Sequence, residues 1–206
     1  MSDSGQGNGT DRDELVQRLE LMEAMIAEGR RATCHHGWIF VLWGVVDLVG
    51  MGWQQMQPHS RWVWFVCLGV GLVLNGLGVW LRRRVDGQGK GATEKSVEAV
   101  WRMMGVTMVL YVVTVLLTHF GWQYSYISAL LMILGMAHAI SAAILRWRVQ
   151  ALVAAVWWAG GVAVLILNSR RATTWIFYVE MCLGMIAFGI YAMVQERRHG
   201  GWGRNV

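Results

Sequence analysis

The sequence predicts an all-α membrane protein: a polytopic bundle of six transmembrane helices, preceded by an amphipathic helix, with both termini on the cytoplasmic side. Composition is the first reason, because the 206 residues are 55% hydrophobic and 15% charged and have a mean hydropathy of +0.39. Charge clustering is the second, because the 43 residues between Arg102 and Arg146 include no Asp, Glu, Lys or Arg. Long uncharged segments of this kind are typical of membrane spans. They exclude a soluble enzyme, a disordered chain and a disulfide-stapled secreted domain.

The first 32 residues are the only sizeable segment predicted to lie outside the bilayer. Residues 1–10 are rich in Gly, Ser, Asn and Gln and are predicted to be a disordered tail. Residues 11–32 are predicted to form an amphipathic helix, because Thr10 and Asp13 have the spacing of a capping box and apolar residues then recur at spacings of four, three and four. The apolar stripe consists of Leu15, Leu19, Met22 and Ile26. This helix either lies on the membrane or on the protein's own underside, or it docks to a partner or a second copy, because so short a helix is marginal alone.

Six segments have the length and composition of transmembrane helices, since about 20 apolar residues cross the hydrocarbon layer. They are residues 36–54, 61–81, 97–119, 124–145, 150–167 and 173–194. The third and fourth divide at residues 119–124, where polar and aromatic side chains suit the headgroup region. Helices are the expected form, because an open sheet cannot span lipid. Residues 196–206 form a short tail.

The distribution of basic residues predicts the orientation in the membrane. With the N-terminus inside, fifteen Lys and Arg residues fall on the cytoplasmic side and three, Arg61, Arg170 and Arg171, fall outside. This bias follows the positive-inside rule for the cytoplasmic (inner) membrane of a bacterium and requires an even number of spans. The cluster Arg82, Arg83 and Arg84 is predicted to stop transfer and to contact anionic lipid or a partner. The net charge of +5 therefore reflects topology rather than nucleic-acid binding.

Four polar residues lie inside the predicted spans, where an ionisable group costs about 2.5–3.5 kcal/mol. They are Asp47 and Glu180 in the outer half of the membrane and Asn75 and His138 in the inner half. Small residues flank each of them at helical spacing, so all four are predicted to face other helices. Asp47 and Glu180 form either a protonatable pair or cation site, or separate hydrogen-bonded groups that fix helix register. His138 is expected to be a packing histidine, with a proton relay or a haem ligand as the alternatives.

Two ridges of small residues predict close helix packing, either within a tight bundle or between subunits. One ridge is Ala151, Ala155, Ala159 and Ala163, and the other is Gly135, Ala139 and Ala143. Because such ridges let two backbones approach closely, the protein is expected to self-associate.

No catalytic signature is present, neither a Gly-x-Ser-x-Gly elbow nor a His-Glu-x-x-His pair. Cys34, His35 and His36 are adjacent but too few for a tetrahedral zinc site. The loop at residues 82–91 ends in Gly-Lys-Gly, so it does not have the pattern of a phosphate-binding loop. We therefore expect no enzymatic activity, no metal and no cofactor.

One segment resembles a known group of proteins. Between Leu15 and Trp53 an acidic helix ends in Glu-Gly-Arg-Arg at residues 28–31 and is followed by Gly37-Trp38 and Trp43-Gly44. This segment, about a fifth of the chain, resembles the start of uncharacterised bacterial multi-span proteins that pair a short cytoplasmic helix with four to six spans. The resemblance implies that architecture and no particular activity.

The expected function is that of a non-enzymatic sensory, regulatory or scaffold subunit. Its cytoplasmic helix and basic rim would meet a cytoplasmic protein or the lipid bilayer. The alternative is a small oligomeric transporter or channel in which Asp47 and Glu180 couple protons or cations.

Overall fold

The computed structural model describes residues 7–58, 60, 62–83, 92–118 and 124–200. Within these residues the fold is all-helical, as predicted, and no strand occurs. Its elements are α1 (Gly7–His35), α2 (Gly37–Met56), α3 (Trp62–Arg83), α4 (Ala92–Thr118), α5 (Tyr124–Leu145), α6 (Arg148–Leu167), α7 (Arg170–Glu180), the π-helical segment η1 (Met181–Ala187) and α8 (Phe188–Gly200).

Six of the described helices are long and apolar enough to cross a membrane, as expected of a multi-pass membrane protein. They are Gly37–Met56, Trp62–Leu81, Ala92–Leu117, Tyr126–Leu145, Arg148–Leu167 and the continuous rod Arg170–Gln195 that joins α7, η1 and α8. The third begins five residues before the predicted residue 97. It continues through Glu94 and Lys95, because charged side chains at a helix end can reach the headgroup region without breaking the helix.

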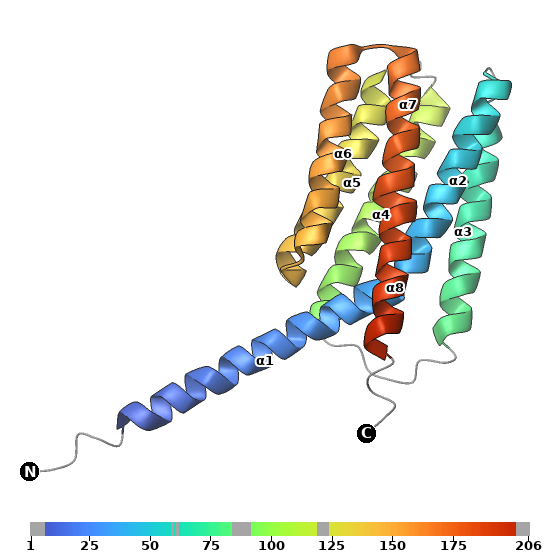
Figure 1. The fold of residues 1–206 in the computed structure, drawn as a ribbon. Helices are drawn as coiled ribbons and strands as arrows, with labels where there is room; N and C mark the ends of the chain where they lie inside the picture. Colours follow the sequence, from blue (N-terminus) through green and yellow to red (C-terminus); the bar gives the residue numbers. More distant parts are fainter. Residues whose placement is uncertain (1–6, 59, 61, 84–91, 119–123, 201–206) are drawn as a thin grey trace, which may run out of the picture.

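Helix α1 is longer than the predicted segment 11–32. It begins at Gly7, so Thr10 lies inside its first turn, and residues 1–6 of the predicted tail are outside the described residues. At the other end α1 breaks at His36, where the backbone N–H donates to the Thr33 carbonyl at 3.2 Å, and α2 follows at once. The break lets α1 leave the bundle obliquely, and both α1 and the end of α8 lie at the same end of the bundle (Figure 1). We call this the α1 end.

The bundle consists of two tight helix pairs with the rod α7–η1–α8 between them (Figure 1). Helices α5 and α6 form an antiparallel hairpin, and α2 pairs with α3. The rod contacts α2 on one side and α6 on the other, while α4 packs against α5 and α1. The interior thus lies among α2, α4, α5, α6 and the rod.

Glycines on α3 set its distance from α2. The Trp43 ring of α2 lies over Gly71, where a Cβ atom would come within 2.8 Å of the ring, and the Trp38 ring lies over Gly78 in the same way. The mirror arrangement occurs at Gly50 of α2, which faces Trp64 of α3. Large rings over glycines are therefore the main contact by which α3 is held, because α2 is its principal neighbour.

Candidate functional site

His138 lies at the centre of the bundle and is 0% exposed. Four rings surround it, each from a different helix: Phe40, Trp101, Trp157 and Phe188. The Trp101 ring meets it edge-on at 4.9 Å, and the Trp157 ring is nearly parallel to it at 6.3 Å. Neither ring nitrogen of His138 has a hydrogen-bond partner. Because a neutral imidazole has one donor and one acceptor nitrogen, His138 needs two polar partners that these rings do not supply.

Ser141 and Gln150 lie nearer the α1 end, on the facing sides of α5 and α6. Both are 0% exposed, and neither the Ser141 hydroxyl nor the two amide atoms of Gln150 has a hydrogen-bond partner. Gln150 is two residues and Ser141 four residues from the end of its helix, which places them about 3 and 6 Å inside the helix ends at 1.5 Å per residue. His138 is one turn further in than Ser141 on the same helix.

Glu180 lies in the middle of the bundle at the junction of α7 and η1. It is 4% exposed, it packs against Gly160 of α6, and its Oε2 has no hydrogen-bond partner. One turn beyond it, Gly184 of η1 makes room for the Trp157 indole, because a Cβ atom at Gly184 would be 2.5 Å from Nε1. That Nε1 also lacks a partner. The π-helical segment thus begins directly after the buried carboxyl group, and such segments are frequent at functional sites.

These groups form a series through the bundle, which we call the buried polar column. Its members, from the α1 end to the opposite end, are Gln150, Ser141, His138, Trp157, Glu180 and Thr173. Every member is at most 4% exposed and carries at least one polar atom without a partner. Each such atom costs about 1–3 kcal/mol if it stays unpaired. Since lipid offers no hydrogen bonds, ordered water or a small polar ligand is needed to satisfy the column.

Asp47 does not belong to the column. It is half-buried on α2, and it interacts electrostatically with Cys67 of α3 and Tyr126 of α5. No hydrogen bond or electrostatic interaction joins Asp47 to Glu180, which packs on α6 instead. The described interactions of the two predicted carboxyl groups are therefore made with different helices.

Asn75 is also separate from His138, although the two were predicted at one depth. It is half-buried on α3, on the stripe of Gly71 and Gly78 that packs under the tryptophans of α2, and its Oδ1 has no partner. Its position agrees with a residue at a helix contact.

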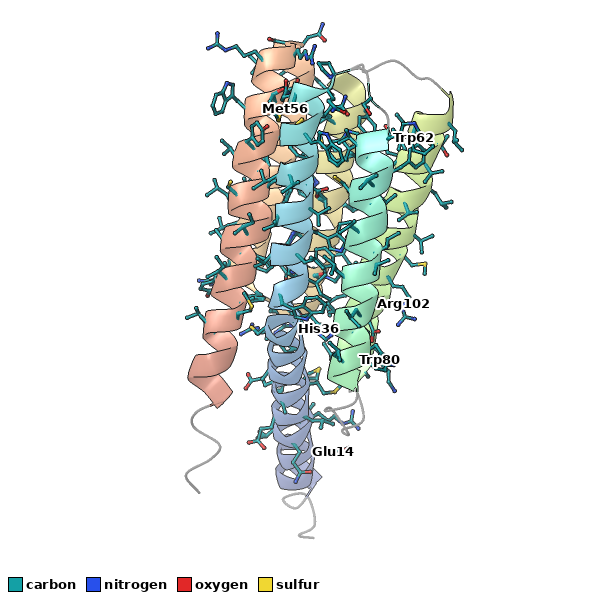
Figure 2. The ribbon with its side chains drawn as sticks, turned by 90° about the vertical axis from the view of Figure 1, so that its right-hand side faces the viewer. Glu14, His36, Met56, Trp62, Trp80 and Arg102 are labelled. Carbon is teal, nitrogen blue, oxygen red and sulfur yellow. The ribbon has the colours of Figure 1, made fainter. Side chains whose placement is uncertain are left out.

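Helix α1 presents the predicted apolar stripe to solvent. Leu15, Leu19 and Met22 are 58%, 57% and 52% exposed, and Ile26 is half-buried. Figure 2 shows Glu14 at the end of α1 that lies clear of the bundle and His36 at its base. No described part of the chain covers the stripe at residues 14–24, where every side chain is exposed.

The alanine ridge of α6 lies on the outside of the bundle rather than in its packing. Ala151, Ala155 and Ala159 are exposed and Ala163 is half-buried. The buried face of α6 is Gln150, Ala154, Trp157, Gly160, Gly161 and Val164. Of the three ridge residues on α5, Gly135 is buried under the Trp158 ring, Ala139 is half-buried and Ala143 is exposed. Packing inside the bundle uses glycines facing large side chains, which leaves the alanines free for contacts with lipid or with another chain.

The remaining predicted residues lie near the α1 end. Arg82 and Arg83 end α3, but their side chains and all of Arg84 lie outside the described residues. Cys34 is buried and His36 is half-buried. Among the described residues, no three His, Cys, Asp or Glu side chains are grouped so that they could hold a metal ion.

Gln150, Trp157 and Ser141 were not predicted as site residues. Gln150 falls at the predicted edge of its span, where a polar side chain is ordinary, and Trp157 and Ser141 have packing roles in most bundles. The signal in the sequence is the stripe Gln150, Ala154, Trp157 and Gly161, which has the spacing of one helical face and ends in the Gly160-Gly161 pair.

Comparison with known proteins adds no functional assignment. No protein-family model, curated protein or solved structure matches the chain. Function is therefore inferred from the geometry of the bundle and of α1.

Proposed function

We propose that the protein is a non-enzymatic, multi-pass protein of a bacterial inner membrane that docks a cytoplasmic protein through α1. The α1 end of the bundle faces the cytoplasm, in keeping with the fifteen basic residues assigned to that side. The observation that carries the proposal is a helix fixed at its base to the bundle, with an uncovered apolar stripe along its free part.

The base of α1 is fixed by contacts that a freely swinging helix would lack. The Arg30 guanidinium donates two hydrogen bonds, from Nε to the Leu145 carbonyl and from Nη2 to the Arg146 carbonyl, both at 2.7 Å. Gly29 is buried, and a Cβ atom there would come within 2.6 Å of Thr93 of α4 and 2.8 Å of Leu145. Because Arg30 satisfies carbonyls at the end of α5, α1 is tied to the bundle at a defined place.

The free part of α1 specifies the chemistry of its partner. The side chains between residues 14 and 27 include three acids, Glu14, Glu20 and Glu23, and one base, Arg18, which pairs with Glu14 at 2.6 Å. An acidic helix is repelled by anionic lipid, so the stripe is better suited to protein than to the membrane surface. The expected partner segment is a helix with an apolar face and basic flanks, which would complete a helix pair with α1.

Site-specific photo-crosslinking of the full-length protein in its native membrane tests this proposal. A crosslinker replacing Leu15, Leu19 or Met22 is expected to capture one partner protein as a discrete band. The same group at Gln17 or Ala24, which are exposed on the opposite face of α1, is expected to capture none. Crosslinks to lipid alone, or equal bands from both faces, would contradict docking through the stripe.

Two charge substitutions on α1 test whether the crosslink depends on the apolar stripe. Leu19→Glu places a charge in the stripe and is expected to remove the crosslink formed from position 15, whereas Ala24→Glu is expected to leave it. Since residues 19 and 24 are both exposed, neither change is expected to disturb the bundle.

The bundle is also proposed to self-associate. Ala151, Ala155 and Ala159 form an exposed ridge of small side chains on α6, against which the backbone of another helix can pack closely. A docking protein that is oligomeric would present several copies of α1 to one partner, which raises the overall affinity without new contacts.

A further inference from the structure

The buried polar column runs almost the whole length of the bundle. Gln150 lies two residues inside the α1 end of α6, and Thr173 lies three residues inside the opposite end of α7. Between them, His138 and Glu180 are the ionisable members. Trp157 links them, because its indole is parallel to the His138 ring and lies against Gly184, one turn from Glu180.

We propose that the column holds a file of water molecules and carries protons between the two ends of the bundle, with His138 and Glu180 as the proton-carrying groups. This function is separate from docking through α1 and does not depend on it. Proton relays inside membrane proteins are built from acidic residues and histidines that face the bundle interior.

The composition of the column selects the proton over other ions. An anion site is excluded because no Lys or Arg belongs to the column. A metal cation would lack ligands, because Glu180 is the single carboxyl group there and no second carboxylate contacts it. Water would supply the missing partners of these atoms, since it needs two to four polar partners and can act as donor to one group and acceptor to the next.

The transfer can be written so that protons and charge balance. A proton arriving through water from the Gln150 and Ser141 side binds one ring nitrogen of His138 and forms an imidazolium. The opposite nitrogen then gives its proton through water to the Glu180 carboxylate, which becomes neutral, and the ring returns to the neutral form with its proton moved. Glu180 passes the proton on toward Thr173, and the ring regains its first tautomer by exchange through the same waters. The membrane potential or a pH gradient drives the net movement.

Few other charged groups face the relay. The rings that Phe40, Trp101 and Phe188 place against His138 from α2, α4 and α8 do not titrate. On α4, the Glu98 and Arg102 side chains near Trp101 pair with each other at 2.7 Å. On α2, Asp47 interacts with Cys67 and Tyr126 instead.

Between Glu180 and Thr173 an apolar side chain interrupts the polar series. Phe177, which is 4% exposed, lies between Glu180 and Thr173 along α7. The rise of seven helical residues separates those two polar side chains by about 10 Å. Water must pass this ring to complete the file, so Phe177 is the step that restricts the flow.

The test is proton flux through the full-length protein reconstituted in liposomes with an entrapped pH dye, under an imposed potassium diffusion potential. Wild type is expected to conduct above protein-free liposomes. Glu180→Gln and His138→Gln, which keep polar side chains but remove the proton-carrying groups, are expected to lower the flux about 100-fold. Asp47→Asn, a matched change to an intramembrane acid outside the column, is expected to conduct as wild type. No wild-type flux, unchanged flux in Glu180→Gln and His138→Gln, or loss of flux in Asp47→Asn would overturn the proposal.

A second measurement covers the case in which a variant fails to fold. Infrared difference spectra of the wild-type protein at acidic pH are expected to show the carbonyl stretch of a protonated carboxyl group that shifts rapidly in D2O, because water reaches Glu180. The band is assigned to Glu180 if it is lost at its wild-type frequency in Glu180→Asp, because this change moves the carboxyl group and alters the frequency of its carbonyl stretch. A Glu180 band that does not shift in D2O would show a dry carboxyl group and would overturn the water file.

Discussion

Gly184→Ala tests the packing on which the buried polar column depends. Gly184 of η1 faces the indole of Trp157, and the Cβ atom of an alanine there would be 2.5 Å from Cε2 and from Nε1. Trp157 is 0% exposed, and its ring lies between His138 and Gly184. The substitution therefore forces the rod α7–η1–α8 away from α6 at a point one turn from Glu180.

The magnitude can be separated from the general effect of replacing glycine in a helix. Glycine to alanine raises helix propensity by about 1 kcal/mol wherever it is made. At Gly76 of α3 no atom lies within 4 Å of the position that a Cβ atom would take. Gly76→Ala therefore measures the effect of helix propensity alone. Overpacking costs about 1–3 kcal/mol. The free energy of unfolding of Gly184→Ala is thus expected to be lower than that of Gly76→Ala by about 1–3 kcal/mol, which is about 5- to 150-fold in the unfolding equilibrium constant.

The assay is reversible unfolding in mixed micelles, in which helix content is followed as the denaturing detergent increases. Both variants and wild type are measured at one protein concentration, because self-association would otherwise change the apparent stability. Equal stability of Gly184→Ala and Gly76→Ala would refute the contact between Trp157 and η1, and with it the continuity of the column.

Three further variants test other parts of the structure. Arg30→Gln removes two hydrogen bonds from a charged donor, each contributing about 1.5–3 kcal/mol, so amide exchange at the base of α1 is expected to accelerate. The control, Arg18→Gln, breaks only the exposed pair with Glu14 and should leave that exchange unchanged. Equal exchange rates in the two variants would argue against the fixation of α1 by Arg30. Ser128→Ala removes the buried hydrogen bond from the Ser128 hydroxyl to the Gly161 carbonyl at 2.7 Å and is expected to lower the free energy of unfolding by about 1 kcal/mol in the same micelles. The control is Thr107→Ala, which should not lower it, because the Thr107 hydroxyl donates within its own helix. Equal free energies of unfolding for the two variants would mean that the hydrogen bond between α5 and α6 adds no stability. Ala155→Leu places a large side chain on the exposed ridge of α6 and is expected to weaken energy transfer between labelled copies in liposomes. The control is Val73→Leu, on the exposed face of α3. An equal loss of energy transfer in Val73→Leu would indicate a general effect of side-chain size rather than an effect of the ridge.

The helices and their number could be predicted because they follow from composition along the chain. Uncharged segments of about 20 residues mark spans wherever they occur, and six such helices are present. The positions of His138 and Glu180 inside spans were equally evident, and both are buried. The glycines around Asn75 indicated a helix contact, and the tryptophans of α2 lie over them.

The sequence did not indicate which helices meet. Asp47 and Glu180 were predicted to lie at similar depths, yet Asp47 interacts with α3 and α5 while Glu180 packs on α6. The alanine ridge of α6 has helical spacing, yet Ala151 and Ala155 are exposed. Spacing along one helix defines a face, but it does not state whether that face meets lipid, a neighbouring helix or another chain.

The sequence by itself determined the number of helices long and apolar enough to cross a membrane, the charge asymmetry and the positions of His138 and Glu180 within those helices. Only the tertiary structure decided that Gln150, Ser141, His138, Trp157, Glu180 and Thr173 belong to one series. The physical reason is that lipid is as apolar as the interior of a helix bundle. Hydrophobic periodicity therefore does not distinguish the buried face of a span from its lipid face, as it does in a soluble helix. Shape decides instead, through rings over glycines and polar atoms that need partners, and shape complementarity exists only between helices already placed side by side.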